Sequence, residues 1–140
     1  DDQNVWQDTV PTATAFTVGS DIAVNNNNDT YIATLFASVD GISKVGYYTG
    51  TGSDQTISLG FTPRFLLFKS IDQTRDWMVF DTVRGIAGSN GNDNQLKLNS
   101  TGAEYTGSNY VEPATNGITV KGDQVTLAAS GEKYIYYAHA

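Results

Sequence analysis

Apolar and polar residues alternate along much of this chain in short runs. From Lys44 to Thr49 the alternation places Val45 and Tyr47 on one face and Gly46 and Tyr48 on the other. A period of two predicts a β-strand, because successive side chains of a strand point to opposite faces. We therefore expect only one of the two neighbouring tyrosines to be exposed on a given face.

Two runs are apolar without alternation. Phe65–Phe68 and Trp77–Phe80 are each of strand length, and the link between them, Lys69–Asp76, is short and polar. Continuous apolar runs predict strands covered on both faces. The short link favours an antiparallel hairpin with Trp77 packed in the core.

Shorter β-like segments account for most of the remaining chain. Asn116–Gly117 predicts a tight turn, and Leu96 and Leu98 are expected to point inward from one of the strands. Further strands are expected over residues 16–18, 31–37, 56–59, 95–99, 118–120, 124–127 and 134–138. No segment shows helical apolar spacing over three turns. The predicted fold is an all-β antiparallel sandwich of jelly-roll or immunoglobulin-like type.

The chain contains an internal repeat. Phe16–Asp21 is similar to Ile118–Asp123, and Tyr31–Ile32 is repeated as Tyr134–Ile135. The separation is 102 positions for the first pair of segments and 103 for the second. A repeat with a nearly constant offset indicates that two strands and a loop occur twice.

The repeat has two interpretations. In a tandem array of modules of about a hundred residues, residues 1–37 are the tail of a preceding module and residues 38–140 a complete module. Alternatively, two edge hairpins of one sandwich are merely similar. Either way, a terminal strand that recurs is suited to pairing across module or subunit boundaries.

Composition excludes several classes of partner and of chemistry. The 140 residues carry a net charge of −7, and the eight Lys and Arg residues are scattered, which argues against nucleic acid and anionic membranes as partners. The chain has no cysteine, so it has no disulfide, thiolate metal site or cysteine nucleophile. No apolar run is long enough to span a bilayer.

Several segments carry a family resemblance. Gly60–Lys69 and Asp76–Gly85 together, with Gly46–Gly52 before them and Tyr134–Ala138 after them, resemble an uncharacterised β-rich module of tailed-bacteriophage structural proteins, where it often recurs in tandem. The resemblance implies a virion component that binds other virion proteins and further copies of itself. It implies no activity, catalytic residue or cofactor, and residues 1–15 lie outside it.

Two groups of residues are candidate ligand or interface contacts. Asp76 and Arg84 flank the second apolar run; they form a polar recognition cluster, or Arg84 pairs with Asp76 or Asp81 at the strand end. The structural alternative is favoured. Trp77 and the pair Tyr47 and Tyr48 are candidates for an aromatic platform that stacks on sugars, although core packing is favoured for Trp77.

Asn92 and Asp93 lie in a Gly/Asn-rich segment that is similar to a calcium loop. The spacing does not match the EF-hand template, so a solvated turn without a metal ion is expected.

Catalysis is not expected. His139 is the only histidine, and there is no nucleophile-elbow sequence. The resulting hypothesis is a non-enzymatic structural protein of a bacteriophage virion, a capsid decoration or tail-fibre component that acts by protein–protein assembly. The alternative is a carbohydrate-binding module that recognises a host-surface glycan.

Overall fold

The computed structural model describes residues 3–86, 88 and 91–140. The chain divides into two compact units, Asp1–Leu35 and Phe36–Ala140. The division falls two residues before the boundary expected from the repeat. Whether the first unit is the tail of a preceding module remains a prediction.

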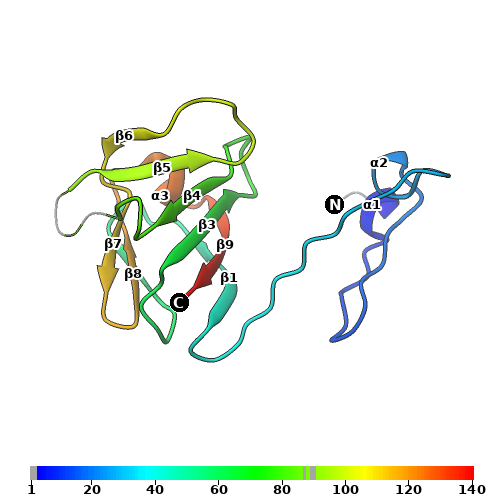
Figure 1. Cartoon of the computed structure of the whole chain (residues 1–140), viewed down its shortest axis with the longest axis horizontal. Coiled ribbons are helices and arrows are strands. Elements are labelled where there is room, and N and C mark those ends of the chain that lie inside the picture. The colour runs from blue at the N-terminus through cyan, green and yellow to red at the C-terminus, as the bar shows by residue number, and fades with distance from the viewer. Residues whose placement is uncertain (1–2, 87, 89–90) are drawn as a thin grey trace. The chain divides into compact units, whose positions relative to one another are not determined.

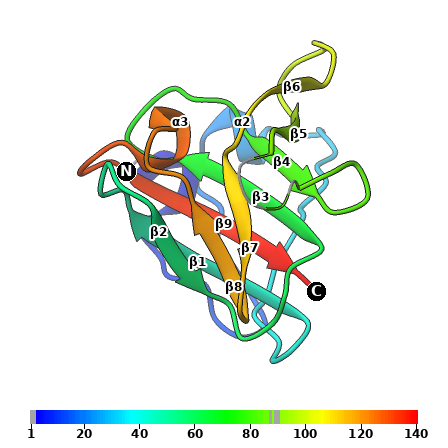
Figure 2. The same cartoon turned by 90° about the vertical axis from the view of Figure 1, so that its left-hand side faces the viewer.

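The second unit consists of two antiparallel sheets, which are shown in Figures 1 and 2. One has the order β1-β9-β3-β4-β5-β6, with bounds Ser43–Thr49, Lys133–His139, Phe65–Ser70, Met78–Asp81, Asp93–Lys97 and Tyr105–Ser108. The other has the order β2-β8-β7, with bounds Gln55–Ser58, Gly117–Val120 and Val111–Ala114. A single helical turn, α3 (Val125–Ala128), precedes β9. The all-β prediction is confirmed.

Strand β3 occupies the middle of the larger sheet, as its continuous apolar run predicts. It pairs with β4 on one side, where Leu67 lies opposite Val79, and with β9 on the other, where Leu67 lies opposite Tyr137. The predicted antiparallel hairpin of β3 and β4 is confirmed. The predicted tight turn at Asn116–Gly117 is confirmed as well, since it joins β7 to β8.

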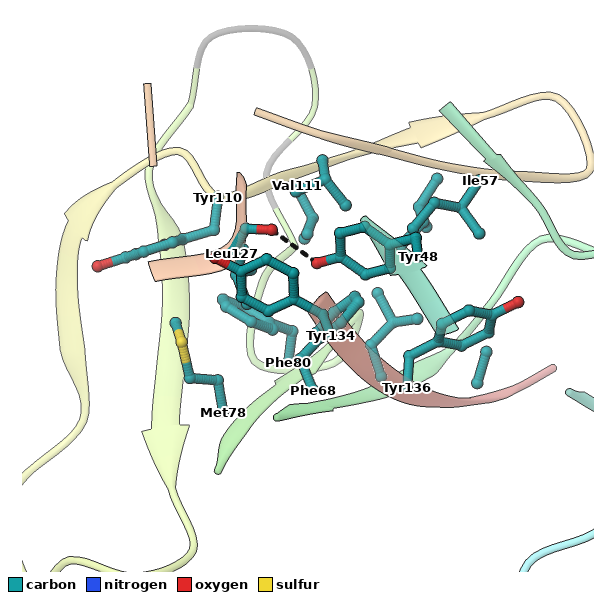
Figure 3. Packing of buried hydrophobic residues seen from close by; sticks show 14 of the residues in the cluster. Tyr48, Ile57, Phe68, Met78, Phe80, Tyr110, Val111, Leu127, Tyr134 and Tyr136 are labelled. Atoms are coloured by element: carbon teal, nitrogen blue, oxygen red, sulfur yellow. Dashed lines mark hydrogen bonds between the residues drawn. The ribbon is translucent and has the colours of Figure 1, made fainter. Parts of the chain in front are cut away.

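The core between the sheets is rich in aromatic rings (Figure 3). The Tyr48 ring stacks on Tyr134 at a centroid distance of 5.1 Å and meets Phe68 edge-on at 6.3 Å. Its hydroxyl donates to the carbonyl oxygen of Leu127 at 2.8 Å. Burial raises the pKa of Tyr48 well above its usual range, so this phenol stays protonated.

Gly46 on β1 makes room for one of these rings. A β-carbon at this position would lie 2.6 Å from the Tyr136 hydroxyl oxygen, closer than van der Waals contact allows. Glycine therefore leaves space for the ring of Tyr136, which lies opposite Gly46 on β9.

An ion pair joins two loops at one end of the unit. Arg75, between β3 and β4, donates from Nε to Glu132 Oε1 at 2.7 Å and from a terminal nitrogen to Oε2 at 2.9 Å. This two-bond pairing is the strongest arginine–carboxylate geometry. The hydrogen bonds from Arg75 lower the pKa of Glu132 to about 2.

The first unit contains little regular structure. Its described residues form two short helices, α1 (Gln3–Trp6) and α2 (Ile22–Asn25). The strands predicted over residues 16–18 and 31–37 were wrong: the chain forms no ladder there with any described strand. An extended segment becomes a strand only when a partner backbone accepts its hydrogen bonds.

Three further predictions for the second unit were wrong. In β5 the inward residues are Asp93 and Gln95, whereas Leu98 is 64% exposed. The strand expected over 124–127 is instead the turn α3. Trp77 precedes β4 and lies outside the core cluster.

We expect Tyr48→Phe to lower the free energy of unfolding by about 1–2 kcal/mol, because the buried Leu127 carbonyl loses its hydroxyl partner. Tyr47→Phe is the matched control, since Tyr47 is 78% exposed, and should change stability by less than about 0.5 kcal/mol. Urea unfolding of both variants gives the comparison. Equal effects would contradict the assigned roles.

We expect the pair of Arg75 and Glu132 to make folding sensitive to acid. Because the folded pKa of Glu132 lies below the value of 4.5 for a free side chain, its contribution is complete above about pH 4.5 and is lost as the pH falls towards 2. Glu132→Gln should cost about 2 kcal/mol at pH 7 and flatten this part of the pH–stability curve. Denaturant unfolding between pH 7 and pH 2 measures this, and parallel curves for both proteins would contradict it.

Candidate functional site

The larger sheet carries apolar side chains on its outer face as well as on its core face. In β1, Val45 lies opposite Tyr137 and Tyr47 opposite Ile135 of β9. Leu67 of β3 lies on the other side of Tyr137. Since side chains alternate along a strand, all five point away from the core that Tyr48 and Tyr136 enter.

Trp77 adds an indole ring to this surface. It is 37% exposed and helps to line a groove of about 280 Å³ together with Leu67 and Ile135. Phe36 also lines the groove, and its ring lies 4.4 Å from that of Tyr137. We call the following residues the outer apolar face: Val45, Tyr47, Leu67, Trp77, Ile135 and Tyr137.

The two candidate tyrosines have different positions, as the alternation predicts. Tyr47 belongs to the outer apolar face and is the most exposed of its members, whereas Tyr48 is buried in the core. Of the two, only Tyr47 is therefore available to a partner.

The structure does not bring Asp76 and Arg84 together. Asp76 pairs with Lys97, Oδ2 to Nζ at 2.7 Å, and accepts from Asn99 Nδ2 at 2.9 Å. The hydrogen bond from Lys97 lowers the pKa of Asp76. Arg84 pairs instead with Asp81, whose carboxylate also accepts from the Arg84 backbone N–H at 2.8 Å. The interpretation that Arg84 ties down the strand end is the one its contacts match.

Asp93 has a structural role that the sequence did not indicate. It is fully buried, and its Oδ2 accepts from the backbone N–H groups of Tyr110 and Val111 at 2.6 and 2.9 Å. The carboxylate thus links β5 of one sheet to the start of β7 in the other. The solvated turn expected here is wrong for Asp93, although its neighbour Asn92 is exposed.

The acidic and histidine side chains are dispersed. Within residues 3–86, 88 and 91–140, no three or more His, Cys, Asp or Glu residues are grouped so that they could hold a metal ion. In that same part of the chain, no helix combines the length and apolar character needed to cross a membrane.

A second groove lies beside β4, β5 and β6 and has both polar and apolar walls. Its volume is about 350 Å³, and its walls include Asp76, Gln95, Lys97, Ser100 and the half-exposed ring of Tyr105. Sequence reasoning found Asp76 but missed Tyr105 and Lys97, because only the pairing of β5 with its neighbours brings them together. Carboxylate, amide and aromatic groups in one groove can bind a sugar ring through hydrogen bonds and stacking.

We expect Asp93→Ala to cost about 2–3 kcal/mol, because two buried backbone N–H groups lose their acceptor. Asp76→Ala, an equal truncation at an exposed ion pair, should cost less than about 1 kcal/mol. Thermal or urea unfolding measures both, with and without millimolar calcium. A calcium-dependent gain that Asp93→Ala abolishes would show a metal role that these contacts do not predict.

A family model described as a domain of unknown function, DUF7483, matches residues 1–140 and so includes both compact units. None of the curated proteins and none of the solved structures matches the chain. Because the family match extends over the full sequence, this chain belongs to the DUF7483 family.

Proposed function

We propose that this chain is a structural module of a bacteriophage virion, a capsid decoration or a component of the tail or tail fibre. In this role it packs against other virion proteins and further copies of itself. The observation that carries the assembly role is the outer apolar face. The virion setting rests on the sequence resemblance.

The outer apolar face has the character of an interface. Its members come from β1, β3 and β9 and from the residue before β4, so they form one surface across neighbouring strands. Contiguous apolar surface of this kind is uncommon on monomers and marks contact sites. Tyrosine and tryptophan are enriched at the centres of protein interfaces because their large rings lose little conformational entropy on binding.

Strand β1 forms the edge of the sheet next to this face, and some of its backbone groups already have hydrogen-bond partners. Contact with a partner is therefore favoured at the face over the edge. The backbone N–H of Val45 in β1 donates to Ser38 Oγ at 3.1 Å, and Val39 bridges to Ser43. This part of the edge is therefore less able to accept an added strand. A partner that packs on the outer apolar face can assemble with this unit without adding strands to the edge of the sheet at β1.

The second candidate function is carbohydrate binding, and the second groove, beside β5, favours it. Its Tyr105 ring and the Asp76–Lys97 pair present stacking and hydrogen-bonding groups together. A host-surface glycan is the proposed ligand. The two functions are compatible, since the groove and the outer apolar face do not share a residue.

Locating the chain in particles tests the first proposal. We expect the protein in purified virions, by mass spectrometry and labelled electron microscopy, and self-association in solution by native mass measurement. Tyr47→Ser with Ile135→Thr should weaken association at least tenfold, because it removes apolar contact area. Val83→Ser, at an exposed apolar residue after β4, is the control. A stable monomer that is absent from particles would overturn the proposal.

Glycan binding is tested independently. An array of bacterial surface glycans should give signals that Tyr105→Ala reduces at least tenfold, because the stacking ring is lost. Tyr47→Ala, outside the groove, should leave them unchanged. No binding to any glycan would remove this candidate.

A further inference from the structure

A tyrosine fixes the turn that leads into β9. The hydroxyl of Tyr134 donates to the carbonyl oxygen of Val125, the first residue of α3, at 3.2 Å. It accepts from the backbone N–H of Ala129, the residue after the helix, also at 3.2 Å. One side chain thereby ties both ends of the helical turn to the start of the next strand.

The first unit contains the same arrangement. The hydroxyl of Tyr31 donates to the carbonyl oxygen of Ile22, the first residue of α2, at 2.9 Å. It accepts from the backbone N–H of Asn26, the residue after that helix, at 2.8 Å. Each of these three residues lies 103 positions before its counterpart in the second unit. The repeat is therefore one of structure as well as of sequence.

The correspondence extends to the preceding hairpin. The β7–β8 hairpin pairs Ala114 with Gly117, and 102 positions earlier the backbone N–H of Thr12 donates to the carbonyl oxygen of Ala15 at 2.8 Å. Pro11 likewise lies 102 positions before Pro113 of β7. Residues 11–37 therefore correspond to the stretch 113–140, from within β7 to the end of β9.

The first unit has an apolar groove of about 530 Å³ where the second unit has its core. Six of the groove residues are Phe16, Val18, Val24, Tyr31, Ala33 and Leu35. At offsets of 102 or 103 they correspond to Ile118, Val120, Leu127, Tyr134, Tyr136 and Ala138, all members of the buried core cluster. The groove is thus lined by the counterparts of core residues from β8, α3 and β9, without counterparts, among the described residues, of the strands that cover them in the second unit.

The second unit shows what covers these positions. Strand β9 lies between β1 and β3, and the Tyr134 ring stacks on Tyr48 of β1. In the first unit, Tyr31 is exposed and Leu35 is 74% exposed, and no described strand pairs with residues 31–37.

We propose that the groove of the first unit receives a further copy of the β1–β6 part of this fold. This copy is supplied by the polypeptide that precedes the unit in a tandem array, and residues 11–37 then complete a module like the second unit. The segment 31–37 takes the position of β9 between strands equivalent to β1 and β3. This inference does not depend on the outer apolar face or on a virion setting.

An extended chain tests this directly. A second copy of residues 38–108 is attached ahead of residue 1. Residues 1–10 then form the connection between the added strands and the hairpin that begins at Pro11. We expect amide hydrogen exchange in residues 31–37 to slow by about a hundredfold or more relative to the 140-residue chain. The denaturant m-value should rise as well, because more surface becomes buried. A chain with a scrambled 38–108 segment is the control and should show neither change.

A substitution separates packing from mere attachment. Leu35→Asp should abolish the new protection in the extended chain, since its counterpart Ala138 is fully buried. In the 140-residue chain the same change should leave the unfolding of the second unit unaltered, because Leu35 is exposed there.

Strand register gives a readout that does not require high stability. Tyr47 pairs with Ile135, whose counterpart is Ile32. The sequence has no cysteine, so cysteines at position 47 of the added copy and at Ile32 should form a disulfide, whereas moving the second cysteine to Ala33 should reduce the yield at least fivefold.

Absence of both protection and register-specific cross-linking, in soluble or refolded protein, would overturn the proposal. Concentration-dependent protection of 31–37 in the unextended chain would also overturn it, by showing that a second copy fills the groove.

Discussion

The position of β9 between β1 and β3 is the constraint on which the rest of the second unit depends. The last strand of this unit joins its first strand to the central one, so the larger sheet is assembled only when β9 has paired with both. Tyr134 and Tyr136 of β9 then enter the core against Tyr48 and Phe68. Sheet pairing and core packing are thus made by the same strand, and they should form together.

The parts of this fold that could be predicted are those where hydrophobic periodicity alone decides the structure. The alternation in β1 separates Tyr47 from Tyr48, and the apolar run of β3 places it between two neighbours. Prediction failed where a specific contact outweighs the pattern. Asp93 points inward because its carboxylate accepts hydrogen bonds from two buried backbone N–H groups. Since side chains alternate along the strand, Leu98 then lies on the solvent side, although an apolar side chain favours burial.

The candidate site was less predictable, for a physical reason. Arg84 has several carboxylates nearby in sequence, and only the turn after β4 decides that Asp81 is its partner. The outer apolar face left a clearer signal: Ile135 and Tyr137 interrupt the alternation of β9, so that strand is apolar on both faces. A strand that is apolar on both faces is suited to burial on both sides of its sheet.

The two ends of the second unit lie side by side. Ser43 at the start of β1 faces His139 at the end of β9, and the backbone N–H of Ala140 donates to the carbonyl oxygen of Ile42 at 2.8 Å. A pulling force applied to the two ends of the second unit therefore acts at one corner. The backbone hydrogen bonds between β1 and β9 then bear the force one after another, beginning at Ser43 and His139, and do not share it.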